Sequence, residues 1–169
     1  IRGAMAVAGA MCLVVTLTPA GMLWAGDVGS IVQQAQQQLT IAIQQAEASL
    51  QPHQPGSGHT KQHMQQVINV LEGRNGKNFN AKVESPGDGE GVTKRLEMTA
   101  EEVKGGQGSK NLQQALDQTM ALVQEAIQHA KRSVQGADVH ETHLQAGLAA
   151  GLLVAAAGRP DSESPITGS

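Results

Sequence analysis

Six histidines are the residues of this chain whose chemistry and spacing are most informative. His59 and His63 are four residues apart, and His140 and His143 are three apart. On an α-helix, either spacing places two imidazoles on one face, with their Cβ atoms about 6 Å apart. Neutral imidazole is a preferred protein ligand for copper, zinc and nickel. Each pair is therefore a candidate chelating site for a divalent metal ion.

The other two histidines fall near the ends of helical segments. His53 lies in a loop bracketed by prolines, from which it could swing toward a neighbouring site. His129 lies opposite the apolar stripe of its own segment, so we expect it to face solvent. We predict one metal site that combines both pairs, with His63, His140 and His143 as ligands, His59 as the fourth and His53 as a mobile substitute. A nearby carboxylate such as Glu47 or Glu141 is expected to orient one of the rings.

Apolar residues recur every three or four positions in four segments, which is the pattern of amphipathic helices. These segments are residues 28–50, 59–72, 111–135 and 139–157. Between the second and third segments lie an irregular stretch, 74–91, and a short helical stretch, 92–104. The sequence predicts an all-α fold: an up-down four-helix bundle with a long loop and a short helix between helices 2 and 3.

The direction of each helix decides whether the histidines meet. In an up-down-up-down bundle, the segment ends that carry them all lie at one end of the molecule. If residues 92–104 joined the bundle as a full helix, the third and fourth segments would reverse and the two histidine pairs would separate. The glycines around this short stretch favour a crossover, so we expect the pairs to share one end.

Two helix faces carry further expectations. The glutamines of the first segment, such as Gln34 and Gln38, are interpreted as a solvated face.

The last segment is apolar on almost every side beyond Gln145, which is typical of a buried helix. Its apolar run is too short to span a bilayer comfortably. Gly147 and Gly151 would allow a neighbouring helix to approach closely, and transmembrane pairing through these glycines is the alternative.

The N-terminal stretch has the pattern of an export signal. Arg2 supplies a positive charge, residues 4–23 are mostly apolar and small, and Ala25 is a small residue suited to the position before a cleavage point. A membrane anchor is the alternative, because the apolar stretch approaches the ~20 residues of a span, although Pro19 favours cleavage. We predict a periplasmic or secreted protein. Its expected organisation is a signal peptide at residues 1–25, a helical domain at 26–157 and a disordered tail at 158–169.

Composition excludes several classes of function. Cleavage would remove Cys12 and Trp24 and leave Phe79 as the sole aromatic residue, so neither disulfides nor thiolate metal sites are expected. A net charge of −3, made one unit more negative by loss of Arg2, does not suit nucleic-acid binding. The sequence has no haem attachment motif, no HExxH, no phosphate loop and no set of nucleophile, base and acid, so we predict that it is not an enzyme.

Two short segments carry a resemblance to a known family. Residues 59–63, with the sequence HTKQH, and residues 125–131, with the sequence EAIQHAK, are similar to segments of the small metal-binding protein family of bacterial periplasms. The resemblance covers the helical segments and excludes residues 79–108. It implies a histidine-bearing four-helix bundle that binds copper and other divalent metals. The alternative is a non-catalytic structural or interaction bundle that binds no metal.

Overall fold

The fold is described by a computed structural model that covers residues 25–51, 56–105 and 110–158. It contains helices α1 (Ala25–Ser49), α2 (Ser57–Glu72), α3 (Val92–Gly105), α4 (Lys110–Gln135) and α5 (Val139–Ala156). No strand occurs in these ranges, and the all-α prediction is confirmed. The predicted signal peptide up to residue 24, His53 and the tail from residue 159 lie outside the described residues.

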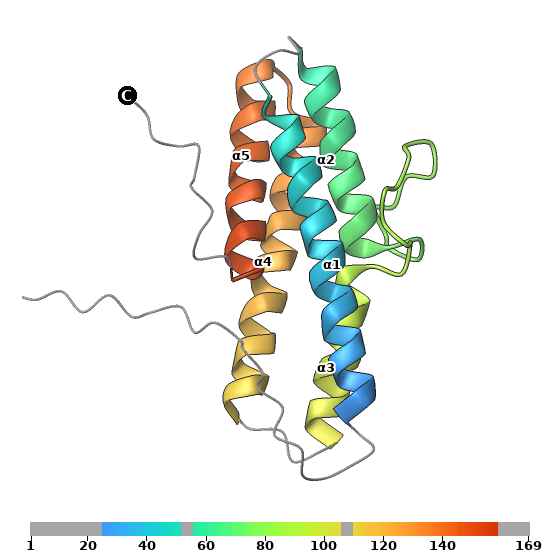
Figure 1. The fold of residues 1–169 in the computed structure, drawn as a ribbon. Coiled ribbons are helices and arrows are strands. Elements are labelled where there is room, and N and C mark those ends of the chain that lie inside the picture. The colour runs from blue at the N-terminus through green and yellow to red at the C-terminus, as the bar shows by residue number, and fades with distance from the viewer. Residues whose placement is uncertain (1–24, 52–55, 106–109, 159–169) are drawn as a thin grey trace, which may run out of the picture.

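The helices form a bundle in which α2 and α3 follow one another in the same direction along one edge (Figure 1). Both helices pack against α1 and α4, while the segment between them, residues 73–91, projects to the side. Helix α3 therefore continues the path of α2 and does not reverse it. As a result, the end of α1, the start of α2, the end of α4 and the start of α5 all lie at the same end of the bundle.

The core is built from aliphatic side chains of all five helices. Ile43, Met64, Leu71, Val92 and Leu153 are fully buried. Each such side chain contributes about 1.5–3 kcal/mol by leaving water. Buried alanines on three of the helices allow close packing without aromatic residues; they are Ala35, Ala42, Ala46, Ala126, Ala130, Ala146, Ala149 and Ala150.

The prediction that α5 is buried on all sides is wrong. One face of α5 enters the core, but Leu144 and Leu148 on the opposite face are 53% and 44% exposed. Gly147 and Gly151 have no other part of the described chain within 4 Å of where a Cβ would lie. Helix α5 lies at the periphery of the bundle and buries one side only. Among the described helices, none is long and apolar enough to cross a membrane.

The segment 73–91 is fixed to α2 by three polar side chains on one helix face. The amide of Asn69 donates to the carbonyls of Asn80 and Val83 at 3.0 and 3.1 Å and accepts the Asn80 N–H at 2.9 Å. The carboxylate of Glu72 accepts from the backbone and side chain of Asn78. Gln65 donates to the Asn78 carbonyl at 3.0 Å. These bonds give an irregular segment a defined shape.

The far end of this segment is held by an ion pair between Asp88 and Arg95 of α3, and both residues also contact glutamines of α1. Arg95, which is 6% exposed, donates to both carboxylate oxygens of Asp88, at 3.2 and 2.7 Å. It also donates to Gln34, and the buried Gln38 accepts the Asp88 N–H at 3.2 Å. The predicted solvated glutamine face is therefore wrong for Gln38. Its side chain is covered because the 73–91 segment packs over α1.

Candidate metal centre

His59 and His63 lie one turn apart near the start of α2. Their ring centroids are 4.3 Å apart and the rings meet edge to face, at 76°. Both side chains are half-buried. The spacing of four residues produces this contact, because such residues are neighbours on one helix face. Two imidazoles this close are within reach of one ion that binds nitrogen at about 2.0–2.1 Å.

The ring of His63 is oriented by a side chain of the neighbouring helix. Its Nδ1 lies 2.8 Å from Oε1 of Gln45 on α1. An amide oxygen can only accept a hydrogen bond, so Nδ1 carries the proton and donates it. In the neutral ring, Nε2 then keeps its lone pair, which is the state that a metal ion requires. The structure thus assigns to Gln45 the orienting role that the sequence suggested for Glu47 or Glu141.

The surroundings of His63 favour the neutral imidazole. Burial of the ring lowers the pKa of His63, and the neighbouring charge of His59 lowers it further. The side chain of Gln66 acts in the opposite direction but does not cancel these effects. The pKa of His63 therefore lies below the ordinary histidine value, and the ring is unprotonated at neutral pH.

The first turn of α2 is attached to the ends of two other helices. The Thr60 hydroxyl donates to the carbonyl of Ser49, at the end of α1, at 3.1 Å. The Lys61 ammonium donates to the carbonyl of Gly136, just after α4, at 2.7 Å. A cation is disfavoured at a helix N-terminus but favoured near C-terminal carbonyls. These two bonds fix the first turn of α2 against the ends of α1 and α4, and the carbonyl at the end of α4 already has the Lys61 ammonium as its cation.

His140 and His143 lie in the first turns of α5. That helix begins with Asp138, whose carboxylate accepts the N–H of Glu141 at 2.8 Å. Glu141 in turn accepts the N–H of Ala137 at 3.1 Å, so its carboxylate belongs to the helix cap and not to a histidine. His140 is exposed and His143 is half-buried.

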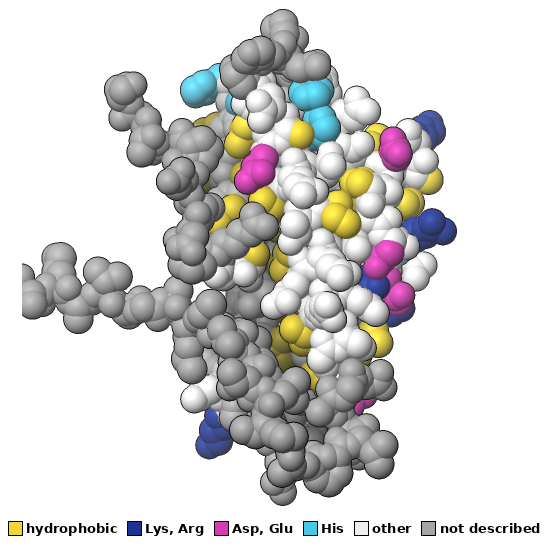
Figure 2. Space-filling view, in the orientation of Figure 1, with side chains coloured by type: hydrophobic (Ala, Val, Ile, Leu, Met, Phe, Trp, Pro, Cys, Tyr) yellow, Lys and Arg dark blue, Asp and Glu magenta, His cyan; other side chains and the backbone are white. Residues whose placement is uncertain are grey.

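The two histidine pairs lie at the same end of the bundle but do not form one cluster. Figure 2 shows histidine side chains gathered at the end where α2 and α5 begin. Within the described ranges, however, no group of three or more histidine, cysteine, aspartate or glutamate side chains is placed to hold one ion. His59 contacts His63, while His140 and His143 make no described contact with that pair. His53 lies outside the described residues.

The expectation that His129 faces solvent is wrong. Its side chain is half-buried, and its Nδ1 lies 2.7 Å from Oε1 of Gln145 on α5. The apolar stripe of α4 alone did not reveal this contact, because α5 packs beside α4 and covers its flank. The arrangement repeats that of His63 and Gln45, with an amide oxygen orienting a single imidazole.

Comparison with known proteins adds no assignment. No protein-family model, no curated protein and no solved structure matches the chain. The resemblance to the periplasmic metal-binding family therefore stays a prediction.

Proposed function

We propose that this protein binds a divalent metal ion, copper, zinc or nickel, through His59 and His63. The proposal places it in the periplasm or outside the cell, as a metal-binding or metal-sequestering bundle. His140 and His143 are proposed as a second pair at the same end, with His53 as an additional ligand. In this view the fold is an up-down four-helix bundle whose second member is interrupted by residues 73–91.

The observation that carries the proposal is the orientation of His63. Its Nδ1 is held by Gln45 at 2.8 Å while its neighbour His59 is in ring contact. Metal-ligating histidines usually donate their second nitrogen to such an acceptor, which fixes the ring and its tautomer. His129 makes the same kind of bond with Gln145, so the feature that distinguishes the proposed site is the second imidazole, His59, in contact with the oriented ring of His63. The donor set, two neutral imidazoles without thiolate, suits copper, nickel and zinc.

Two protein ligands leave the remaining coordination positions to water or to an incoming ligand. Such a site would exchange its ion, which suits sequestration better than a permanent structural role. Because binding requires neutral imidazoles, affinity should decrease as the pH falls through the histidine range. The lowered pKa of His63 should extend binding to a lower pH than an ordinary histidine would allow.

A second candidate function is an interaction bundle without metal. The observation in its favour is the exposed apolar face of α5, with Leu144 and Leu148. Monomeric proteins tolerate scattered exposed leucines, so this face is a weaker argument than the oriented imidazole.

Titration of the protein with zinc, followed by NMR of the imidazole signals, separates the two candidates. The metal proposal predicts that the signals of His59 and His63 shift together and saturate. The signal of His129 should not change, because it is a single imidazole already bonded to Gln145. Equal, unsaturated shifts of every histidine would contradict the metal proposal and leave the interaction bundle.

A further inference from the structure

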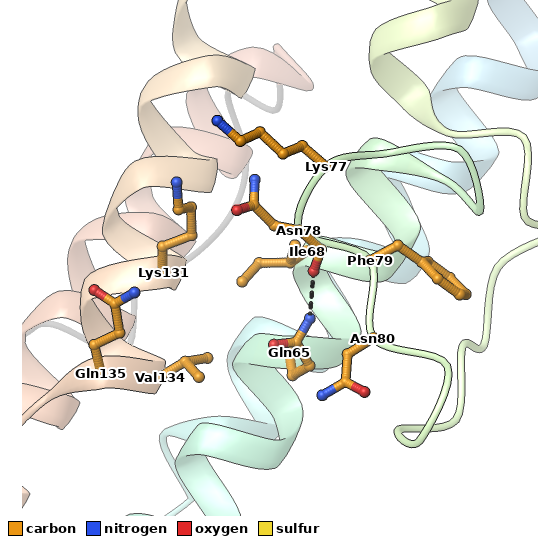
Figure 3. Close-up of a pocket in the computed structure, with 9 residues that line it drawn as sticks. All are labelled: Gln65, Ile68, Lys77, Asn78, Phe79, Asn80, Lys131, Val134 and Gln135. Atoms are coloured by element: carbon orange, nitrogen blue, oxygen red, sulfur yellow. Dashed lines mark hydrogen bonds between the residues drawn. The ribbon is translucent and has the colours of Figure 1, made fainter.

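A polar pocket of about 320 Å³ opens between α2, α4 and the start of the 73–91 segment. It is lined by Gln65, Ile68, Lys77, Asn78, Phe79, Asn80, Lys131, Val134 and Gln135 (Figure 3). This volume is at the lower end of the range of small-molecule sites. No histidine lines the pocket, so it is separate from the candidate metal centre and independent of the function proposed above.

The charge of the pocket is positive although the chain as a whole carries −3. Lys77 comes from the irregular segment and Lys131 from α4, and Figure 3 shows both side chains on the same side of the pocket. None of its nine lining residues is acidic. Neither lysine has an ion-pair partner among the described residues. Two ammonium groups on one pocket favour a negative charge there, and the neighbouring carboxylate of Glu72 is already engaged by the backbone and side chain of Asn78.

The wall that carries Lys77 is held in place before any ligand arrives. Gln65, which is 8% exposed, donates to both Asn69 and the carbonyl of Asn78. The side chain of Asn78 is held by Glu72. A wall fixed by buried amides loses little conformational freedom when a ligand binds, which favours affinity.

Two amide side chains add hydrogen-bond donors. The oxygen of Asn80 accepts the N–H of Lys82 at 3.0 Å, which leaves its nitrogen free to donate. Figure 3 draws the amide of Gln135 next to Lys131, and Asn80 at the opposite edge of the pocket, beyond Gln65. Val134 supplies a small apolar surface, with the fully buried Ile68 behind it. The pocket therefore combines two cations and amide donors with a short apolar surface.

We propose that this pocket binds a small organic anion, whose carboxylate or phosphate oxygens lie between Lys77 and Lys131. Hydrogen bonds from charged donors to an oxyanion are the strong interactions available here. The apolar surface of Val134 would contact the carbon skeleton of the ligand. The carboxylate and phosphate sources share this chemistry and are distinguished by the probes used.

The test is a titration of the protein with succinate and, separately, with inorganic phosphate, each followed by calorimetry and by NMR of the side-chain amides. Saturable binding that shifts the side-chain amide of Gln135, which lies beside Lys131, is expected. The variant Lys77→Gln/Lys131→Gln should bind at least about tenfold more weakly, because charge-assisted hydrogen bonds are lost. The matched control is Lys82→Gln, a lysine on the same segment that does not line the pocket, and it should bind like the unchanged protein.

Binding of succinate but not phosphate would assign the site to carboxylates, and the reverse result would assign it to phosphates. Absence of saturable binding of both probes would overturn the proposal. So would an equal loss in the Lys82→Gln variant, since it would show general attraction of anions to lysines. The far-ultraviolet circular dichroism of the Lys77→Gln/Lys131→Gln variant should match that of the unchanged protein, which reports that the bundle is folded.

Discussion

Replacing Asn69 tests whether one side chain holds the irregular segment in place. Asn69 is fully buried on α2 and takes part in four hydrogen bonds, with Gln65, with Asn80 twice and with Val83. At about 0.5–1.5 kcal/mol for each bond, complete loss would cost about 2–6 kcal/mol. Gln65 keeps its bond to Asn78, and the partly exposed carbonyls can reach water. We therefore expect Asn69→Ala to lower the free energy of unfolding by about 2–4 kcal/mol.

Urea unfolding followed by far-ultraviolet circular dichroism measures this change. The same loss should lower the melting temperature by about 5–15 °C for a chain of this size. The matched control is Gln62→Ala, an exposed position on the same helix, for which a change within about 0.5 kcal/mol is expected. A loss below about 1 kcal/mol for Asn69→Ala would refute the role given to these four bonds.

The variant Asn69→Asp separates hydrogen bonding from side-chain volume. It keeps the two accepting bonds but directs a carboxylate at the carbonyls of Asn80 and Val83. We expect it to be at least as destabilised as Asn69→Ala at neutral pH. Stability should partly return on acidification, because the protonated carboxyl can donate to one carbonyl. Stability independent of pH, relative to the unchanged protein, would contradict this explanation.

Three further predictions concern single residues, each checked by unfolding or titration. Gly73→Ala should lower the free energy of unfolding by about 2 kcal/mol or more, since φ is 70° and a Cβ would clash with the carbonyl oxygen of Glu90. Gly147→Ala, in open space, should stabilise α5 by about 0.5–1 kcal/mol. Partial burial acts to raise the pKa of Asp88, but a backbone N–H and Arg95 outweigh it and the pKa lies below its usual value. The ionised Asp88 carboxylate therefore stabilises the folded state. Its contribution to the free energy of unfolding is present above about pH 3.9 and is lost as the pH falls through the folded pKa. Arg95→Met should reduce this pH dependence of stability. Gln45→Leu should weaken metal binding about 10–100-fold while leaving the fold intact.

The sequence predicted the helices because their apolar spacing is local information. The role of residues 92–104 was not predicted: they were expected to form a crossover, whereas α3 packs against α1 and α4 and continues the path of α2. The sequence predicted less well which face of each helix would be buried. The apolar residues of α5 surround the helix, so periodicity did not indicate that Leu144 and Leu148 would be exposed. The contact of His129 with α5 depends on packing between helices, which the stripe of α4 alone does not describe.

Only the local part of the candidate site, the spacing of two histidines on one helix, was predicted from the sequence. The pairing of His59 with His63 follows from a spacing of four residues, and the structure shows their rings in contact. Gln45, which orients His63, is one of many glutamines in α1, and nothing in its sequence context distinguishes it. Lys77 and Lys131 are far apart in the chain, and both line one pocket because residues 73–91 fold back on α2. Side chains brought together by such long-range packing leave no pattern in the sequence.

Calorimetric titration of the protein with copper at neutral pH tests the central claim most directly. We expect saturable binding with a dissociation constant of about 10 µM or tighter, lost in the variant His59→Ala/His63→Ala and kept in His129→Ala. Zinc and nickel should follow with lower affinity. Circular dichroism should show the double variant folded, since neither side chain is part of the buried apolar core. Absence of binding, or binding by the double variant as tight as that of the unchanged protein, would contradict the assignment of the metal centre to His59 and His63.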